Sequence, residues 1–296
     1  MKSTTYRKLL EQKLKKRKDI KITYQTLHYW FWNYKIGTII SKKNKKTLYI
    51  RAGIHGEEVW WPLSILGAIN QIINYAHKKN IGLIIHPLAN PAGFENNTRY
   101  SDIKNPPKNG NNNVIIYELS NGKYSDDIGE KDISKNRHRS NQKEKTLPPE
   151  SIFTIEELQK NIKNLNIIWI LDIHQDYITP TKENFAYHYG FWNTKIYDSI
   201  IKKIKRICKI YPKKPINAWF QNKITKKKTT SMWKGIIPNN DWRIIRHDWT
   251  LWAAAYQLWI PYNVTCETTW TTPYKIAKKV NITWIKWIID IIANNQ

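Results

Sequence analysis

Cysteine is scarce in this sequence: among 296 residues there are two, Cys208 and Cys266. Two cysteines cannot build the several disulfides that stabilise small secreted domains, and these two do not form the close pair typical of zinc–thiolate sites. A reducing compartment is therefore favoured. Cys266 stands inside an apolar strand pattern, so we predict that it is a small buried hydrophobe.

Long apolar runs are also missing. No stretch approaches the roughly 18 consecutive apolar residues that a membrane-spanning helix requires. The segment 1–10 is mostly polar and basic, without the apolar core of a secretory signal. The sequence thus predicts a cytoplasmic protein with no membrane partner.

Acidic residues are few: 23 Asp and Glu stand against 49 Lys and Arg, which gives a formal net charge of +26. This excess raises the local concentration of anions of every kind, including nucleic acid and carboxylate substrates. The lysines are spread along the chain rather than gathered in one block. Net charge alone therefore indicates no dedicated binding face, and nucleic acid stays an alternative partner.

Tryptophan, by contrast, is abundant, with 15 residues. A surface that stacks nucleic-acid bases is one use for such residues. Trp284 and Trp287, however, lie three residues apart in a helical pattern, which is more typical of packing. We predict that these tryptophans belong to the core.

The length and the order of the patterns favour one α/β domain. We expect a basic N-terminal helix or tail at residues 1–20 and a single domain at 21–296, with an irregular insertion at about 101–149 that is rich in Asn, Lys, Pro and Gly. A strand at 47–52, a helix at 63–77 and a strand at 82–86 follow one another. This order predicts a three-layer α/β/α fold with a mixed, mostly parallel sheet covered on both faces.

Further elements are expected along the rest of the chain. The apolar periodicity predicts strands at 34–40, 167–174, 184–190 and 261–267, and helices at about 152–164, 193–211, 250–259 and 274–295. In such sheets ligands bind outside the carboxyl ends of the strands. Side chains that follow these strands are therefore the first candidates for a site.

The segment 51–58, Arg-Ala-Gly-Ile-His-Gly-Glu-Glu, carries His55 and Glu58 directly after the first of these strands. In an H-x-x-E spacing the imidazole and the carboxylate lie one turn apart and can face one cation if a helix starts there. His174 and Glu267 close two later strands. Two histidines and one carboxylate form an open zinc set that leaves the fourth position to water.

These segments, together with Asn-Pro-Ala-Gly-Phe-Glu-Asn-Asn-Thr-Arg at 90–99, occur in an order that resembles the zinc carboxypeptidase family. The resemblance is closer to its succinylglutamate desuccinylase and aspartoacylase-like branch, and it runs from about Leu48 to the C-terminus. It implies that His55, Glu58 and His174 hold one Zn²⁺ per chain. The family pattern selects Glu58 over the neighbouring Glu57.

The same resemblance implies the remaining roles. Glu267 stands at the position of the general acid/base, and Arg99 matches the donor that stabilises the oxyanion. Asn136 and Arg137 match a pair that clamps a substrate carboxylate. In the family this element reads Asp-x-Asn-Arg, whereas here Ser134 occupies the place of the Asp, unless Asp132 fills it after a shift of two residues.

The predicted function is zinc-dependent hydrolysis of an amide bond in a small carboxylate-bearing substrate, either an N-acyl amino acid or a short peptide. Digestive carboxypeptidases place a tyrosine in the loop before the catalytic Glu, and the segment 242–249 contains none. This departure favours the deacylase branch. The alternatives are a metallocarboxypeptidase acting on peptides and a basic nucleic-acid- or anion-binding protein on a hydrolase scaffold.

Overall fold

The computed structural model describes residues 1–29, 32–41, 46–99, 117–118, 124–125, 149–162, 164–176, 182–190, 194–210, 260 and 262–294. The predicted helix at 250–259 lies outside these residues, as does most of the insertion at 101–149.

The centre of the described structure is a mixed eight-stranded sheet with the order β1-β2-β4-β3-β7-β10-β8-β9. Its strands are β1 (Ile20–His28), β2 (Asn33–Ser41), β3 (Thr47–Ala52), β4 (Gly82–His86), β7 (Ile167–Asp176), β8 (Phe185–Gly190), β9 (Lys209–Ile210) and β10 (Tyr262–Thr269). Two short strands, β5 (Tyr117–Glu118) and β6 (Tyr124–Ser125), pair with each other apart from it.

The middle of the sheet is parallel. Strand β3 pairs in parallel with β4 and β7, and β7 pairs in parallel with β10. On one side β2 joins β4 antiparallel and β1 joins β2 antiparallel, while on the other side β8 joins β10 antiparallel. The carboxyl ends of β3, β7 and β10 therefore meet at one edge of the sheet.

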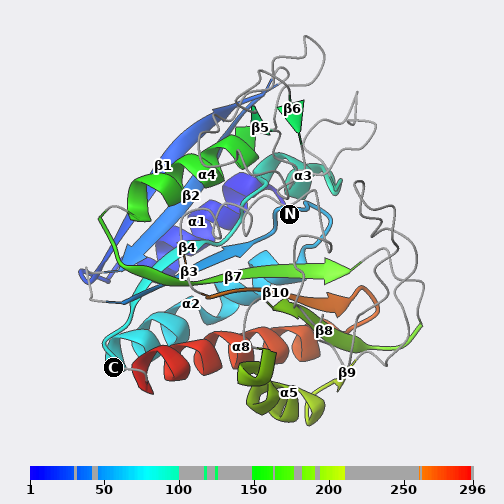
Figure 1. Ribbon diagram of the computed structural model, residues 1–296. Coiled ribbons are helices and arrows are strands. Elements are labelled where there is room, and N and C mark those ends of the chain that lie inside the picture. The colour runs from blue at the N-terminus through cyan, green and yellow to red at the C-terminus, as the bar shows by residue number, and fades with distance from the viewer. Residues whose placement is uncertain are drawn as a thin grey trace.

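Helices cover both faces of this sheet (Figure 1). The helices are α1 (Ser3–Leu14), α2 (Trp60–Lys78), α3 (Pro91–Asn96), α4 (Pro149–Ile162), the 3-10 turn η2 (Thr194–Tyr197), α5 (Asp198–Lys205) and α8 (Tyr274–Asn294). The main core joins α1, α2, α5 and α8 to one face, and Phe153 of α4 packs with Leu27 and Ile36 on the other. The predicted three-layer α/β/α class is confirmed.

Binary patterning explains why the helices lie where they do. In α2 the buried residues include Ile65, Ile69, Ile72 and Ile73, which recur at the spacing of one helix face. Helix α8 packs beside α2 with a similar stripe of isoleucines and tryptophans. Among the described helices, none combines the length and the apolar character needed to cross a membrane.

Several predicted boundaries were wrong. Helix α2 begins at Trp60 rather than at 63. Strand β1 is not among the strands expected above, because at the edge of the sheet its residues are mostly half-buried and do not alternate clearly. The helix expected at 193–211 is confined to η2 and α5. The last residues of the predicted helix instead form β9, which pairs with Phe185 and Ala186 of β8.

The N-terminal helix docks on the domain. Tyr6, Leu10 and Leu14 are buried in the main core, while Leu9 faces solvent. The Tyr6 hydroxyl donates to the carbonyl of Pro62 at 2.8 Å, at the start of α2. Ser3 donates through its backbone N–H and its hydroxyl to the Glu95 carboxylate at the end of α3.

The predicted packing of the tryptophans is confirmed for Trp284 and Trp287, which are buried in α8. Cys266 is fully buried, as predicted. His188 lies in an aromatic enclosure beside Trp284 and Tyr197, with ring centroids 4.8 and 5.1 Å away. Burial disfavours a charged imidazole there and lowers the pKa of His188 from 6.5 to about 3.

This burial predicts a sensitivity to acid. The folded-state pKa of His188 lies below its unfolded value, so its contribution to stability is full above pH 6.5 and is lost as the pH falls towards 3. By pH 5 the loss amounts to about 2 kcal/mol. Replacing His188 with glutamine should remove this part of the pH dependence, as measured by denaturant unfolding at pH 7 and pH 5.

The matched control is His28→Gln, since His28 is exposed on β1; it should keep the pH dependence of the wild type. An unchanged pH dependence in His188→Gln would show that the imidazole does not titrate across folding.

Candidate metal centre

The turn after β3 carries the first two candidate ligands. Gly53 leaves the strand with a φ of +68°, a conformation that favours glycine, and residues 54–57 form turns before α2 begins. The backbone N–H of Glu58 donates to the carbonyl of His55 at 3.2 Å. No helix starts at His55; instead a tight turn brings the His55 and Glu58 side chains onto one side.

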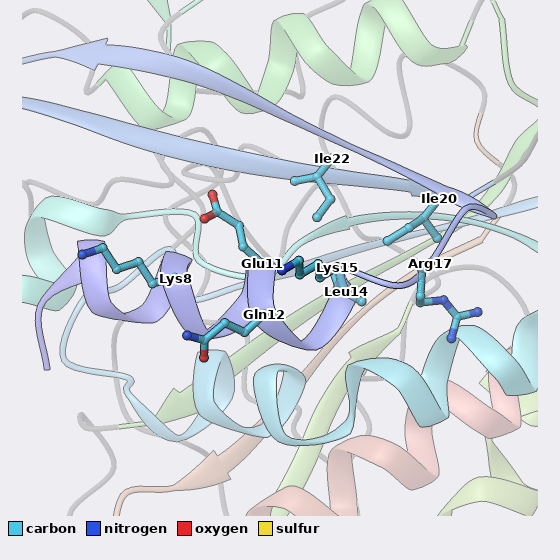
Figure 2. A pocket seen from close by; sticks show the side chains of 8 residues that line it. All are labelled: Lys8, Glu11, Gln12, Leu14, Lys15, Arg17, Ile20 and Ile22. Carbon is cyan, nitrogen blue, oxygen red and sulfur yellow. The ribbon is translucent and has the colours of Figure 1, made fainter.

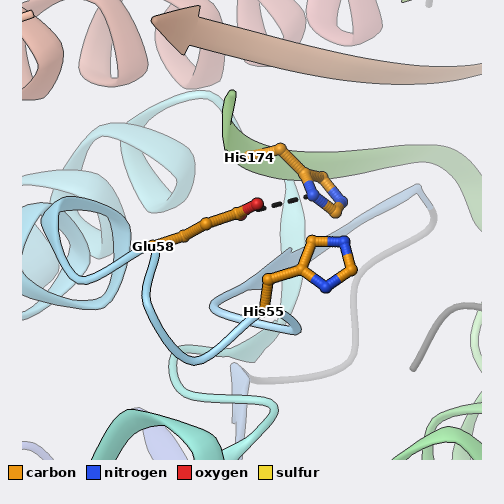
Figure 3. Close-up of side chains that lie close together, drawn as sticks. All are labelled: His55, Glu58 and His174. Atoms are coloured by element: carbon orange, nitrogen blue, oxygen red, sulfur yellow. Dashed lines mark ion pairs between the residues drawn. The ribbon is translucent and has the colours of Figure 1, made fainter. Parts of the chain in front are cut away.

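Strand β7 brings the third candidate to this turn. His55, Glu58 and His174 each offer one ligand atom, and these atoms all lie within 4.8 Å of one another. In Figure 3 the rings of both histidines and the Glu58 carboxylate converge on one small space. His174 Nδ1 lies 3.3 Å from Glu58 Oε2, and the three residues are 2%, 1% and 4% exposed in chain order.

The donor set suits zinc. Imidazole nitrogen and carboxylate oxygen are both zinc ligands, and two histidines with one glutamate form an open site with room for water. Buried groups of this kind are costly without a counter-charge, and a cation supplies one. The residues present therefore fit a divalent metal, and zinc is among the ions that such ligands bind.

The carboxylates in and beside this cluster favour a positive charge on His174. Burial by itself lowers the pKa of His174, but the carboxylates of Asp172 and Glu58 outweigh burial and raise this pKa to about 10. A cation held by Nδ1 would take the place of the proton there.

Asp172 is a polar neighbour that sequence reasoning missed. His174 Nε2 lies 3.0 Å from Asp172 Oδ2, and the Asp172 carboxylate receives two hydrogen bonds from Arg51 of β3. Burial raises the pKa of Asp172, but Arg51 and His174 more than offset this effect and hold it below its ordinary value. The signal was present in the sequence, since Asp172, His174 and Asp176 alternate along a mostly apolar strand and so share one face.

Helix α3 packs against the turn that carries His55 and Glu58. Asn90 caps α3 by accepting from the Gly93 N–H at 2.8 Å, and its amide donates to the Ile54 carbonyl at 3.2 Å. Gly56 lies so close to α3 that a Cβ there would come within 2.0 Å of the Gly93 carbonyl carbon. Only glycine fits between His55 and Glu57 at this distance.

Arg99 reaches the same turn from the end of the 90–99 segment. Its Nη1 lies 2.8 Å from Glu57 Oε1 and 3.7 Å from Glu58 Oε1. Burial and the neighbouring Glu58 raise the pKa of Glu57, and the Arg99 guanidinium partly offsets them. Glu57 therefore faces the arginine, whereas Glu58 faces the histidines.

Glu267 lies beside His174. The two residues are paired in the parallel register of β7 and β10, so their side chains leave the sheet on the same face, on strands about 4.8 Å apart. Glu267 is half-buried, and Tyr187 of β8 is its partner on the other side. Asn136, Arg137 and the segment 242–249 lie outside the described residues, and the structure does not place them.

A separate hollow lies beside the C-terminal half of α1. It has a volume of about 540 Å³ and lies between α1 and the start of β1, where Figure 2 shows Lys8, Glu11, Lys15 and Arg17 around it. Arg17 is held there by a bidentate pair with Asp19. No residue of the histidine–glutamate cluster lines this hollow, and its mixed charges do not form a set of metal ligands.

Comparisons with known proteins agree with the fold. A candidate metallopeptidase from Shewanella baltica superposes with a TM-score of 0.65 at 18% identity, over 97% of this chain and 91% of that chain. Bovine thrombin-activatable fibrinolysis inhibitor, in complex with a tick carboxypeptidase inhibitor, gives 0.59 at 14% identity, over 100% and 98%. A metallo-carboxypeptidase from Pseudomonas aeruginosa, in complex with (2-guanidinoethylmercapto)succinic acid, gives 0.52 at 12% identity, over 98% and 68%.

No protein-family model matches the sequence, and no curated protein matches it. The chain therefore shares the α/β fold of metallopeptidases and metallo-carboxypeptidases. Because the sequence identities are low, the likeness shows the fold alone.

The close approach at Gly56 predicts a specific defect. In Gly56→Ala the new methyl group must push the turn away from the α3 backbone, which we expect to cost about 1–3 kcal/mol of stability. The displaced His55 and Glu58 should bind zinc at least about tenfold more weakly. Thermal unfolding and zinc titration would measure both effects.

Gly67→Ala in α2 is the matched control, because its Cβ would meet side-chain atoms only, the flexible end of Lys278 and the Tyr274 hydroxyl, instead of backbone. It should bind zinc like the wild type. Equal zinc affinity in the two variants would mean that the turn is not rigidly placed.

Proposed function

We propose that this chain is a zinc-dependent hydrolase that cleaves an amide bond in a small carboxylate-bearing substrate. The observation that carries the proposal is that His55 and Glu58 converge with His174, which is distant from them in the sequence, into one buried cluster. The likeness in fold to metallopeptidases and metallo-carboxypeptidases supports it.

In this proposal His55, Glu58 and His174 hold the ion. A zinc ion in such an open site supplies a water whose pKa is lowered towards about 7, so that hydroxide is available near neutral pH. The protein contributes the fixed geometry: a turn buttressed by α3 holds two ligands, and a buried strand holds the third.

Glu267 would act as the general acid/base. Its pairing with His174 in the strand register, on the same face of the sheet, and its half-buried position support this role. It would take a proton from the attacking water and return it to the leaving nitrogen.

Arg99 would stabilise the oxyanion of the tetrahedral intermediate. Its guanidinium is held against Glu57 at the rim of the cluster. A donor fixed in advance in this way is worth roughly 3 kcal/mol to the transition state. Arg137 and Asn136 complete the proposal as the clamp for the substrate carboxylate, a role that rests on the sequence resemblance alone.

Two classes of substrate are compatible with this proposal. We favour N-acyl amino acids, as in the desuccinylase and aspartoacylase-like branch, over the C-terminal residues of peptides. A panel of N-acyl amino acids and dipeptides, assayed with the zinc-loaded protein, separates the two. Turnover confined to peptides would assign the chain to the carboxypeptidase alternative.

The proposed function predicts the metal content of the protein. Purified wild-type protein should contain about one zinc per chain, and His174→Ala should lose it, because two ligands bind zinc far more weakly than three. Elemental analysis and chelator competition would measure this. His28→Ala, at an exposed strand position, is the matched control and should keep the metal.

Absence of zinc from the wild type, together with no affinity on titration, would contradict the proposal. The net charge of +26 would then favour the binding of an anionic polymer. Such binding should weaken steeply with salt, because phosphate contacts release counterions.

The proposed function also predicts the effect of replacing Glu267. Replacing it with glutamine keeps its size but removes its ability to accept a proton, so turnover should fall at least about a hundredfold while zinc stays bound. Glu183→Gln, at an exposed carboxylate that pairs with Lys209, should retain full activity. Near-normal turnover in Glu267→Gln would refute its role.

A further inference from the structure

Resting on the proposed function, we infer that Arg51 and Asp172 form a buried positioning pair that orients His174 for metal binding. Neither residue offers a ligand atom to the cluster of His55, Glu58 and His174. Their role would be to fix which ring nitrogen of His174 faces that cluster.

The pair is built into the centre of the sheet. Arg51 of β3 and Asp172 of β7 are partners in the parallel register. Arg51 Nε donates to Asp172 Oδ1 at 2.9 Å, and Arg51 Nη2 donates to Asp172 Oδ2. Only 1% of Arg51 and 3% of Asp172 is exposed, so the bidentate pair is removed from water.

The hydrogen bonds determine the orientation of the imidazole. Both oxygens of Asp172 accept from the Arg51 guanidinium, which has no acceptor and always carries charge. A carboxylate in such a pair is ionised and can only accept. The contact of 3.0 Å between His174 Nε2 and Asp172 Oδ2 is therefore a bond in which Nε2–H donates, which leaves Nδ1 to face Glu58.

Stability alone gives a weak reason for this arrangement. Removing two charges from water costs several kcal/mol for each ion, and well-packed apolar residues often replace buried ion pairs without loss. A hydrogen bond from a ligand histidine to a carboxylate has a direct use, since it fixes the ring and increases its basicity as a ligand. The pair also ties β3, which leads to His55, to β7, which carries His174.

The test is Asp172→Asn in the full-length protein, with zinc affinity measured by chelator competition. An amide has one acceptor oxygen, and its NH2 group would face a donor, so it cannot accept all three hydrogen bonds that the carboxylate accepts from Arg51 and His174. Zinc should therefore bind about 10- to 100-fold more weakly. The matched control is Asp19→Asn, which changes the other bidentate Arg–Asp pair of the described structure, far from the cluster. It should leave zinc affinity unchanged.

A second variant guards against misfolding, because Asp172→Asn leaves Arg51 buried without its counter-charge. The double variant Arg51→Met with Asp172→Leu removes both charges together with the acceptor for His174, and it puts apolar residues of similar size in their place. If it folds with the thermal stability of the wild type and still binds zinc at least tenfold more weakly, the loss comes from positioning. Wild-type zinc affinity in either folded variant would overturn the inference.

A spectroscopic measurement separates this inference from the proposed function. In the wild type without added metal, ¹H–¹⁵N spectra should show the Nε2–H of His174 as a downfield signal protected from exchange, and Asp172→Asn should lose it. If the wild type binds no zinc, the proposed function fails, and the signal still decides whether Asp172 orients His174. If zinc binds and the signal does not depend on Asp172, the proposed function stands and the positioning role is refuted.

Discussion

The structure depends on the parallel pairing of β3 with β7. This pairing places the end of residues 47–52 beside the end of residues 167–176, although more than a hundred residues separate them in the chain. It brings the turn with His55 and Glu58 against His174, and it joins Arg51 to Asp172 beneath them. Because both strands are buried, these polar side chains have no water to solvate them and must satisfy one another or a cation.

The packing around this pair keeps the cluster rigid. Helices α2 and α8 cover one face with isoleucine and tryptophan, and that face of β7 carries only apolar side chains up to Ile173. The opposite face carries Asp172, His174 and Asp176 in alternation. One strand therefore serves the core with one set of residues and the site with the other, since side chains alternate across a sheet. Helix α3 adds a backbone contact at Gly56 that leaves the ligand turn little freedom to move.

Charge in the site is organised in pairs. Asp172 is neutralised by Arg51, Glu57 is matched by Arg99, and Glu58 faces His174. Such an arrangement lets a buried centre hold several ionised groups at once, because each has an opposite charge within contact distance. Binding a cation between Glu58 and the two histidines would displace a proton while leaving the other pairs in place.

The sequence by itself determined the fold class, most of the strands and helices, and the three candidate ligands, because apolar periodicity and short motifs are local properties of the chain. It could not fix the turn at residues 54–57, the edge strand β1 or the early end of α5. Those features depend on contacts with α3, β2 and β8. The partnership of Arg51 with Asp172 was likewise decided by tertiary structure, since only strand pairing tells which buried charges meet.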